Sequence, residues 1–266
     1  MKKIKNLLTV IMCALLIISP VMTETASAAT VEKTKGTSVS KVSNGWVTTS
    51  GGKTKYRKNG KFVKGCQKIG RNYYFFDANG IMQKKNTTFK GVLYYINDKG
   101  QVQGRKHGSQ YFSPDGRRLN RDKSNDMRAY QNARRIVNGI TNAHMSKAQK
   151  LKVCFNWMQN NGYGGWRRLS DGGRSWYAVN ANDLFEGRRG DCISYACAFA
   201  YLAKVIGYKN INICSRGTRN DSYHTWTEIN GRVYDSYFGK RRGVSRYYGI
   251  PYSKFDYKVV FRQKIA

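Results

Sequence analysis

An apolar run from Cys192 to Ile206 constrains the fold more than any other part of the chain. It contains neither Pro nor Gly, and it is too apolar for a helix with one solvent face, so it predicts a buried helix. Asp191 is a candidate N-cap, and Gly207 is a typical helix stop. Such a helix would begin with a thiol. Cys192 is therefore either a small packing residue or a nucleophile at a helix N-terminus.

The first 28 residues have the pattern of a secretory signal. Three lysines precede an apolar run from Leu7 to Val21, and Ala26-Ser27-Ala28 is a small-residue cleavage site. The apolar run is too short to span a bilayer comfortably, and no other segment qualifies, so we expect an exported protein with no membrane span after cleavage. Residues 29–44, rich in Thr, Ser, Lys and Val, are predicted to be a linker.

Charge and cysteine usage narrow the class of partner. The full chain carries a formal net charge of +33, which becomes +31 without residues 1–28. For an exported protein this favours anionic cell-wall polymers. No motif indicates specific nucleic-acid binding, although a nucleic-acid binder remains an alternative that rests on charge alone.

Five cysteines would remain after cleavage, an odd and scattered set that predicts at least one free thiol. We expect no cofactor and no metal, because the three histidines do not cluster with cysteines at ligand spacing.

A repeat occupies residues 45–120. Aromatic or apolar residues precede a polar turn that ends in glycine, at Gly60, Gly80, Gly100 and Gly116. The dipeptides Asn59-Gly60, Asn79-Gly80 and Asp115-Gly116 favour tight hairpin turns with positive φ at both central positions. A single hairpin cannot bury a core, whereas stacked copies can, so the repeat predicts an all-β hairpin solenoid.

These units resemble the cell-wall-binding, or choline-binding, repeats of Gram-positive surface proteins. The resemblance rests on "GW" at 45–46 and on "NYYFFDANGIM", and it implies a protein of the cell wall or cell surface of a Gram-positive-type bacterium. In that family Trp and Tyr faces surround a quaternary ammonium, which makes Trp46, Tyr74 and Tyr94 the candidate wall-ligand aromatics. The remaining repeat aromatics are interpreted as solenoid core: Tyr73, Phe75, Tyr95 and Tyr111.

After residue 122 the pattern changes to helices followed by strands. One helix begins near Ser124 or Asp126, and a second begins at a capping box formed by Ser146 and Gln149. Residues 163–190 are interpreted as an ordered loop region. Strand-like runs follow the buried helix, at 211–215, 223–229, 232–238 and 257–263. This order predicts an α+β domain over residues 125–266.

The middle two of these strands meet at Asn230-Gly231, the strongest short hairpin signal. A two-residue loop pairs Trp226 with Asp235, and it places His224 and Asp235 as diagonal neighbours on one face. If that face packs against the start of the buried helix, His224 meets Cys192 with Asp235 behind it. The helix N-terminus and an imidazolium would then lower the thiol pKa, while the charge of Asp191 would raise it; we expect His224 to dominate.

Three segments, "GDCISYACAFAYLAKVIGY", "HTWTEI" and "VYDSYF", are similar to the transglutaminase-like superfamily, whose core has a papain-like fold. The resemblance implies a Cys-His-Asp triad of nucleophile Cys192, base His224 and orienting acid Asp235. It implies attack on peptide or glutamine amide bonds, with either water or an amine as acceptor. The alternative is a non-catalytic surface protein that uses such a domain only to bind.

Overall fold

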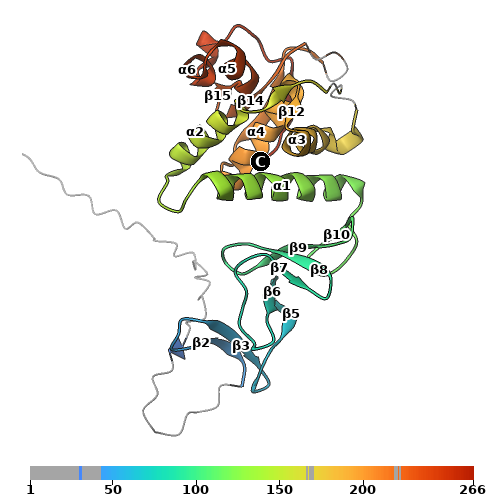
Figure 1. Ribbon diagram of the computed structural model, residues 1–266, viewed down its shortest axis with the longest axis vertical. Helices are drawn as coiled ribbons and strands as arrows, with labels where there is room; N and C mark the ends of the chain where they lie inside the picture. Colours follow the sequence, from blue (N-terminus) through green and yellow to red (C-terminus); the bar gives the residue numbers. More distant parts are fainter. Residues whose placement is uncertain (1–29, 32–42, 166, 168–170, 219–220, 222) are drawn as a thin grey trace, which may run out of the picture. The chain divides into compact units, whose positions relative to one another are not determined.

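The computed structural model describes residues 30–31, 43–165, 167, 171–218, 221 and 223–266 (Figure 1). The predicted signal segment and most of the predicted linker lie outside these residues. The chain divides into two compact units, Met1–Val63 and Lys64–Ala266. No helix among the described residues is long and apolar enough to cross a membrane.

The first unit contains a small sheet. Its strands are β1 (Thr30–Val31), β2 (Gly45–Thr48), β3 (Thr54–Lys58) and β4 (Lys61–Phe62), joined in that order. Strand β1 pairs with β2 in parallel, and the other pairs are antiparallel. Asn59 and Gly60 have φ values of 51° and 73°, which confirms the predicted tight turn between β3 and β4. Trp46 packs edge-on against Tyr56 at 5.0 Å between ring centroids.

The second unit opens with hairpins. Strands β5 (Gly65–Ile69) and β6 (Asn72–Phe76) form one pair, and β7 (Thr87–Phe89), β8 (Val92–Ile96), β9 (Val102–His107) and β10 (Gln110–Phe112) form an antiparallel sheet. Their core contains Phe75, as expected, together with Tyr94, Ile96 and Val102. Tyr95 is also buried, as expected, whereas Tyr73 and Tyr111 are half-buried.

Two of the predicted hairpin turns have a different geometry. Gly80 and Gly116 have positive φ, but Asn79 and Asp115 do not, so these are not two-residue turns with two left-handed positions. The first is instead closed by the Asp77 side chain, whose Oδ1 accepts from the backbone N–H groups of Asn79 and Ile81 at 2.9 Å. An Asx side chain thus replaces one left-handed residue, which the dipeptide rule does not detect.

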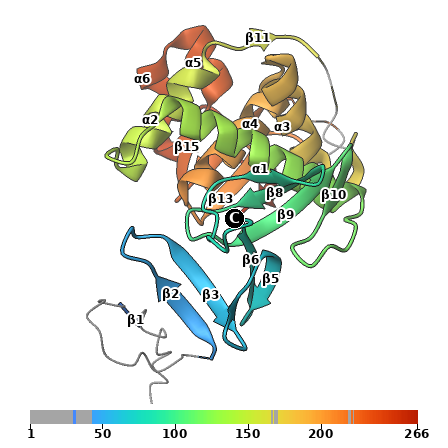
Figure 2. The ribbon, with the colours of Figure 1, turned by 60° about the horizontal axis from the view of Figure 1, so that its bottom comes forward.

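The helices of the second unit are α1 (Arg121–Ile140), α2 (Lys147–Met158), α3 (Trp176–Gly187) and α4 (Cys192–Ile206), with the short helix η1 (Gly173–Ser175) before α3. Helix α4 is the predicted buried helix, and both of its ends agree with the prediction: Asp191 is its N-cap and Gly207 its C-cap. Helices α1, α2 and α3 pack around α4 in one apolar core. Helix α1 lies between this core and the β7–β10 sheet, as Figures 1 and 2 both show.

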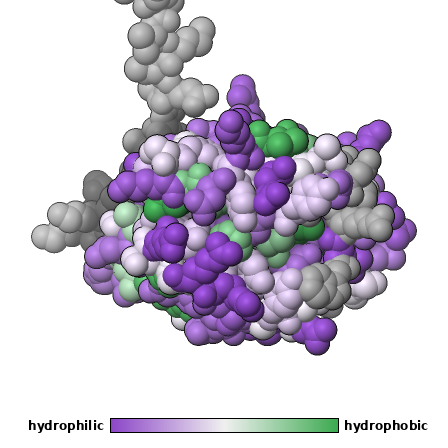
Figure 3. All heavy atoms as spheres, turned by 90° about the horizontal axis from the view of Figure 1, so that it is seen from above, coloured by the Kyte–Doolittle hydropathy of each residue, from purple (hydrophilic) through white to green (hydrophobic). Residues whose placement is uncertain are grey.

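An antiparallel sheet of order β16-β15-β14-β13-β17 covers the other side of α4. Its strands are β13 (Ile211–Ser215), β14 (Thr225–Ile229), β15 (Arg232–Tyr234), β16 (Tyr248–Ile250) and β17 (Phe261–Lys264). Ile213, Thr227 and Ile229 face α4, and Thr227 Oγ1 donates to the Ala196 carbonyl at 2.8 Å. This mixed architecture with antiparallel sheets confirms the α+β prediction. In the view of Figure 3, hydrophilic side chains cover most of the face shown, with scattered hydrophobic spots.

Three sequence-based element assignments outside the β14–β15 hairpin are wrong. Helix α1 begins at Arg121 rather than near Ser124 or Asp126, because Asn120 caps it by accepting from the Lys123 N–H at 3.0 Å. The segment predicted as an ordered loop, residues 163–190, contains α3. The Gly- and Arg-rich sequence before α3 obscures its short helical pattern. The predicted strand 257–263 is shorter and later, at Phe261–Lys264.

The predicted strand 232–238 ends at Tyr234, which is the most consequential correction. Asp235 is the N-cap of α5 (Ser236–Arg242), because its side chain accepts from the Phe238 N–H. The following α6 (Val244–Tyr247) and the short η2 (Tyr252–Lys254) lie in the remaining connections. The predicted pairing of Trp226 with Asp235 is therefore absent from the ladder, which holds three pairs from Thr227↔Tyr234 to Ile229↔Arg232.

Candidate active site

Three element ends meet where α4, β14 and α5 begin. Cys192 is the first residue of α4, His224 directly precedes β14, and Asp235 caps α5. Each position is set by local chemistry: Asp191 Oδ1 caps α4 by accepting from the Ser194 N–H at 2.9 Å, and the hairpin turn at Asn230 fixes the end of β14.

His224 and Asp235 are in direct contact. Imidazole Nε2 lies 2.5 Å from Asp235 Oδ2, and both side chains are buried, with 6% and 1% of their surfaces exposed. Asp235 Oδ1 accepts from the Phe238 N–H at 2.9 Å, so both carboxylate oxygens are used. Because Nε2 faces the carboxylate, Nδ1 is the nitrogen left for a reacting group.

The Cys192 sulfur lies beside the backbone N–H of Thr225, the residue that follows His224. The N–H groups of Thr225 and Ile193 point at its sulfur and lower the thiol pKa, and Asp235 is close enough for its charge to raise that pKa. The side chain is half-buried. All five cysteines of the described residues are free thiols, which agrees with the prediction of at least one.

The pKa of Cys192 is shifted in the opposite direction from the sequence-based expectation. Burial is the largest cause and the charge of Asp191 the next, and together they raise the thiol pKa to about 12. The two N–H groups that face the sulfur are not enough to offset burial. The thiol is therefore neutral at physiological pH in this arrangement, and it needs a base to give up its proton.

Aromatic rings surround the imidazole. Phe238 stacks on it at 4.0 Å between centroids and an interplanar angle of 14°, Tyr257 lies at 5.3 Å, and Trp226 and Tyr237 both lie at 6.3 Å. Trp226 and Tyr237 therefore both lie beside the imidazole, and Tyr237 belongs to α5. The face of β14 that carries Trp226 packs into a second core with Phe238, whereas α4 covers the opposite face.

Sequence reasoning missed Tyr163. It belongs to β11 (Gly162–Tyr163), which pairs in parallel with β12 (Arg189–Gly190) immediately before α4. Its ring stacks on Tyr237 at 5.2 Å, and it remains 46% exposed. Burial, the Tyr237 hydroxyl and the nearby Cys192 raise the pKa of Tyr163 to about 12. Tyr163 lies between Gly162 and the pair Gly164-Gly165, and this short segment has no periodic pattern that sequence reasoning could use.

A second buried carboxylate is structural. Glu228 lies on β14 and accepts hydrogen bonds from Asn212 at 2.8 Å and from Tyr252 and Arg262 at 2.7 Å. Burial raises its pKa, but these three bonds together outweigh burial and lower it. With every oxygen engaged by fixed partners, Glu228 has no free position for a substrate.

The three candidate wall-ligand aromatics belong to three different strands, β2, β6 and β8. Trp46 belongs to the first unit, and Tyr74 is half-buried on β6 of the second. Tyr94 is only 8% exposed, packs on Phe75 at 4.6 Å between centroids, and has the Arg105 guanidinium over its ring. Tyr94 is therefore part of the hairpin core, with little open ring face for a ligand.

Several solved structures are similar to a part of the chain. The chain is 25% identical to the choline binding domain of Spr1274 from Streptococcus pneumoniae (22% of this chain, 89% of that chain, TM-score 0.20). It is 24% identical to CbpF in complex with ipratropium (29% and 25%, TM-score 0.23) and 20% identical to an alternansucrase in complex with isomaltononaose (28% and 6%, TM-score 0.23). These scores do not define a fold for the chain.

No curated protein matches the chain. Residues 134–239, however, match the family model of the transglutaminase-like superfamily. The matched segment runs from the middle of α1 into α5, and it includes Cys192, His224 and Asp235. This part of the chain is similar to transglutaminase-like domains.

Proposed function

We propose that the chain is a cysteine enzyme of acyl transfer, which acts on peptide or glutamine amide bonds through Cys192, His224 and Asp235. The observation that carries the proposal is the buried 2.5 Å contact between His224 and Asp235 in the corner where the Cys192 thiol meets the Thr225 N–H. A buried imidazole oriented by a carboxylate beside a helix-terminal thiol is the arrangement that nucleophilic catalysis requires.

In the proposed reaction the Cys192 sulfur attacks the amide carbonyl carbon while the thiol proton moves to His224 Nδ1. The tetrahedral intermediate then collapses: the carbon–nitrogen bond breaks, the leaving amine takes the proton from the imidazole, and a thioester remains on Cys192. Water or a second amine attacks this thioester and returns the thiol. Asp235 accepts from Nε2–H throughout, which leaves Nδ1 as the base and stabilises the imidazolium.

The thiol pKa of about 12 makes this proton transfer essential. At pH 7 only about one thiol in 10⁵ would ionise without a base, against a few per cent for an ordinary cysteine with a pKa near 8.5. The base must therefore act in the same step as the attack. The developing oxyanion would be met by the backbone N–H of Cys192 at the start of α4, where the helix dipole also favours negative charge.

The setting of the enzyme completes the proposal. Residues 1–28 have the composition of an export signal, and the hairpin repeats together with a net charge near +31 suit attachment to anionic wall polymers. We therefore propose an exported, wall-associated enzyme of a Gram-positive-type bacterium, with hydrolysis slightly favoured over cross-linking.

The test is mass spectrometry of purified wall peptides and of casein, each with and without an added amine, after treatment with wild type or Cys192→Ala. We expect fragments or deamidated glutamine for hydrolysis and amine adducts for transfer, in either case only with wild type. Unchanged substrates in every arm, from protein that melts cooperatively, would refute acyl transfer on these substrate classes.

A non-catalytic binding domain is the second candidate, and one observation favours it: burial and Asp191 keep the Cys192 thiol neutral. Cys154, whose pKa burial also raises to about 12 without any imidazole nearby, is the internal reference. In the enzyme, iodoacetamide labels Cys192 faster than the fully buried Cys154 at mildly acidic pH, and His224→Ala slows the labelling of Cys192. Labelling of Cys192 that His224→Ala leaves unchanged would favour the binding domain.

A further inference from the structure

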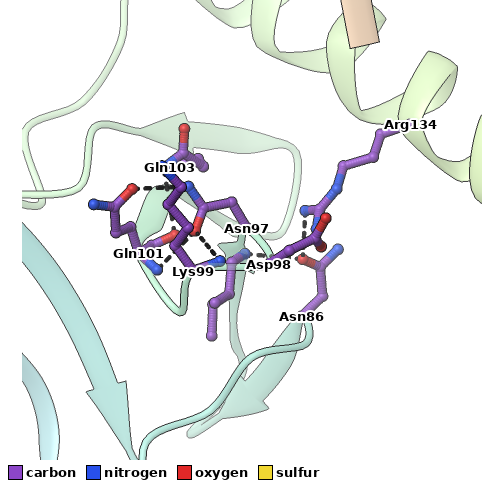
Figure 4. Close-up of polar contacts among 8 residues, drawn as sticks. Asn86, Asn97, Asp98, Lys99, Gln101, Gln103 and Arg134 are labelled. Carbon is purple, nitrogen blue, oxygen red and sulfur yellow. Dashed lines mark hydrogen bonds and ion pairs between the residues drawn. The ribbon is translucent and has the colours of Figure 1, made fainter. Parts of the chain in front are cut away.

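A groove runs between the β7–β10 sheet and the side of α1 that faces it. Two hollows of about 670 and 660 Å³ form it, and both are lined by Asn86, Gln131 and Arg135. Because they share these residues, the two hollows are one continuous feature. Figure 4 shows one of its margins, where Arg134 reaches from α1 to Asp98 and Asn86.

Basic side chains dominate the lining. Two arginines have carboxylate partners: Arg128 pairs with Glu186, and Arg134 lies 3.3 Å from Asp98. Three of the other cations form no ion pair with a carboxylate within the described part of the chain: Lys84, Lys85 and Lys106. Arg135 acts at longer range on Glu186, whose pKa it helps to lower. With six cations and two carboxylates, the lining has a net positive charge of four, and the cations are distributed over both hollows.

The remaining lining suits hydroxyl-rich groups. Tyr95 and Tyr111 stack nearly parallel, with centroids 6.4 Å apart and an angle of 11°, and Lys106 lies 5.6 Å from the Tyr111 ring. Side-chain amides line the groove on the α1 side, and Gln131 makes no side-chain hydrogen bond to any other described residue. Side-chain amides and an aromatic edge can bind the hydroxyl groups of a ligand, and cations bind its phosphates.

From this combination we infer that the groove binds a polymer of polyols or sugars joined by phosphodiesters. Its phosphates lie against Lys84, Lys85 and Arg135, and its hydroxyl groups lie against Gln131 and Tyr111. The inference rests on the wall-attachment part of the proposed function and adds a site and a ligand class to it. Charges spread along a groove match successive phosphates better than one isolated phosphate, and the buried Tyr95 offers no open face on which a nucleobase could stack.

The experiment measures binding of the purified protein to immobilised poly(glycerol phosphate) over a range of salt concentrations. The test variant combines Lys84→Gln, Lys85→Gln and Arg135→Gln. The matched control combines Lys209→Gln, Lys254→Gln and Lys258→Gln, three exposed cations outside the groove. Both variants lose three charges, so attraction to the overall charge falls equally. We expect the groove variant to bind about tenfold more weakly, with a salt slope smaller by about 2, and the control to change by less than about twofold.

Three further arms make the ligand class testable. Inorganic phosphate at the same phosphate concentration should compete poorly; equal competition would overturn the polymer and indicate a single-phosphate site. Tyr111→Leu should weaken binding of poly(glycerol phosphate) more than binding of inorganic polyphosphate. An equal loss of affinity for both would overturn the proposed contacts to hydroxyl groups. Duplex DNA that loses as much affinity as the polymer in the groove variant would overturn the inference in favour of nucleic acid.

Equal weakening in the groove and control variants would also refute it, because general surface charge would then explain the binding. Thermal melting of each variant separates loss of binding from loss of fold. Cys192→Ala should bind the polymer like wild type. The groove and the acyl-transfer proposal therefore fail or stand separately.

Discussion

Asp235 orients His224 with one carboxylate oxygen and caps α5 with the other, and Asp235→Asn separates these two roles. In the protein Oδ2 contacts His224 Nε2 at 2.5 Å and Oδ1 accepts from the Phe238 N–H at 2.9 Å. Asparagine keeps the size of the side chain but has one acceptor oxygen and one donor amino group. At a position only 1% exposed, water cannot replace the lost acceptor.

The amide has two orientations, and each has a different cost. If its oxygen stays on His224, the α5 cap is lost and the amino group faces the Phe238 N–H. The lost cap costs about 1 kcal/mol and the unsatisfied buried donors about 1–3 kcal/mol more, so we expect a loss of about 2–4 kcal/mol in the free energy of unfolding. The imidazole tautomer is then kept, and catalysis loses only the contribution of the negative charge beside the imidazolium.

If the oxygen turns to Phe238, stability is largely kept. The amino group then donates to Nε2, and the imidazole proton must sit on Nδ1, the nitrogen proposed to accept the thiol proton. General-base catalysis is worth about 10² to 10⁴ in rate, and we expect that factor to be lost. Stability and activity thus cannot both survive the substitution.

Three measurements resolve the outcome: urea unfolding, the rate of iodoacetamide labelling of Cys192, and the imidazole tautomer from nitrogen NMR. Asp256→Asn, at an exposed carboxylate, is the matched control and should change none of them. If Asp235→Asn retains both the unfolding free energy and the labelling rate of wild type, the two-oxygen account of Asp235 is wrong.

Three other substitutions have defined outcomes. Asp191→Asn retains a good N-cap but removes a charge that raises the Cys192 thiol pKa, so the pH profile of Cys192 labelling should move to lower pH. Glu228 has a lowered pKa in the folded protein, so its contribution is complete above about pH 4.3 and is lost as pH falls through the folded value; Glu228→Gln should unfold more easily in urea at neutral pH and show a weaker acid dependence. A Cβ added at Gly190 would lie 2.5 Å from Ser194 Cβ, in the first turn of α4, so Gly190→Ala should lower the unfolding free energy by about 1–3 kcal/mol and slow Cys192 labelling; a wild-type melting curve would contradict this.

Local rules with a single physical cause predicted their elements well. The Asp191 cap and the Gly207 stop bound α4 as expected, and the capping box of Ser146 and Gln149 starts α2. The Asn230-Gly231 turn, with φ values of 51° and 75°, sets the three-pair register between β14 and β15. In each case the determining atoms lie within a few residues of one another, so the sequence contains the whole interaction.

The errors arose where two local signals compete. The segment from Arg232 to Phe238 is rich in strand-forming residues, yet Asp235 also matches an N-cap, and the cap prevails because the Phe238 N–H and a following buried helix turn supply its partners. The thiol pKa was misjudged for a different reason. Depth of burial is a property of the assembled core, and no spacing in the sequence reports how much water remains beside Cys192.

The candidate triad therefore does not depend on the strand ladder from which it was predicted. If the ladder between β14 and β15 continued through Asp235, this residue would lie diagonal to His224. Only the strand geometry would then orient its carboxylate. In the structure all three residues stand at the ends of elements: the first turn of α4, the residue before β14 and the cap of α5. The buried body of α4 and its bond from Thr227 fix where Cys192 and β14 lie relative to each other. The α5 cap then fixes Asp235 independently of the ladder between β14 and β15, because its Oδ1 accepts from the Phe238 N–H.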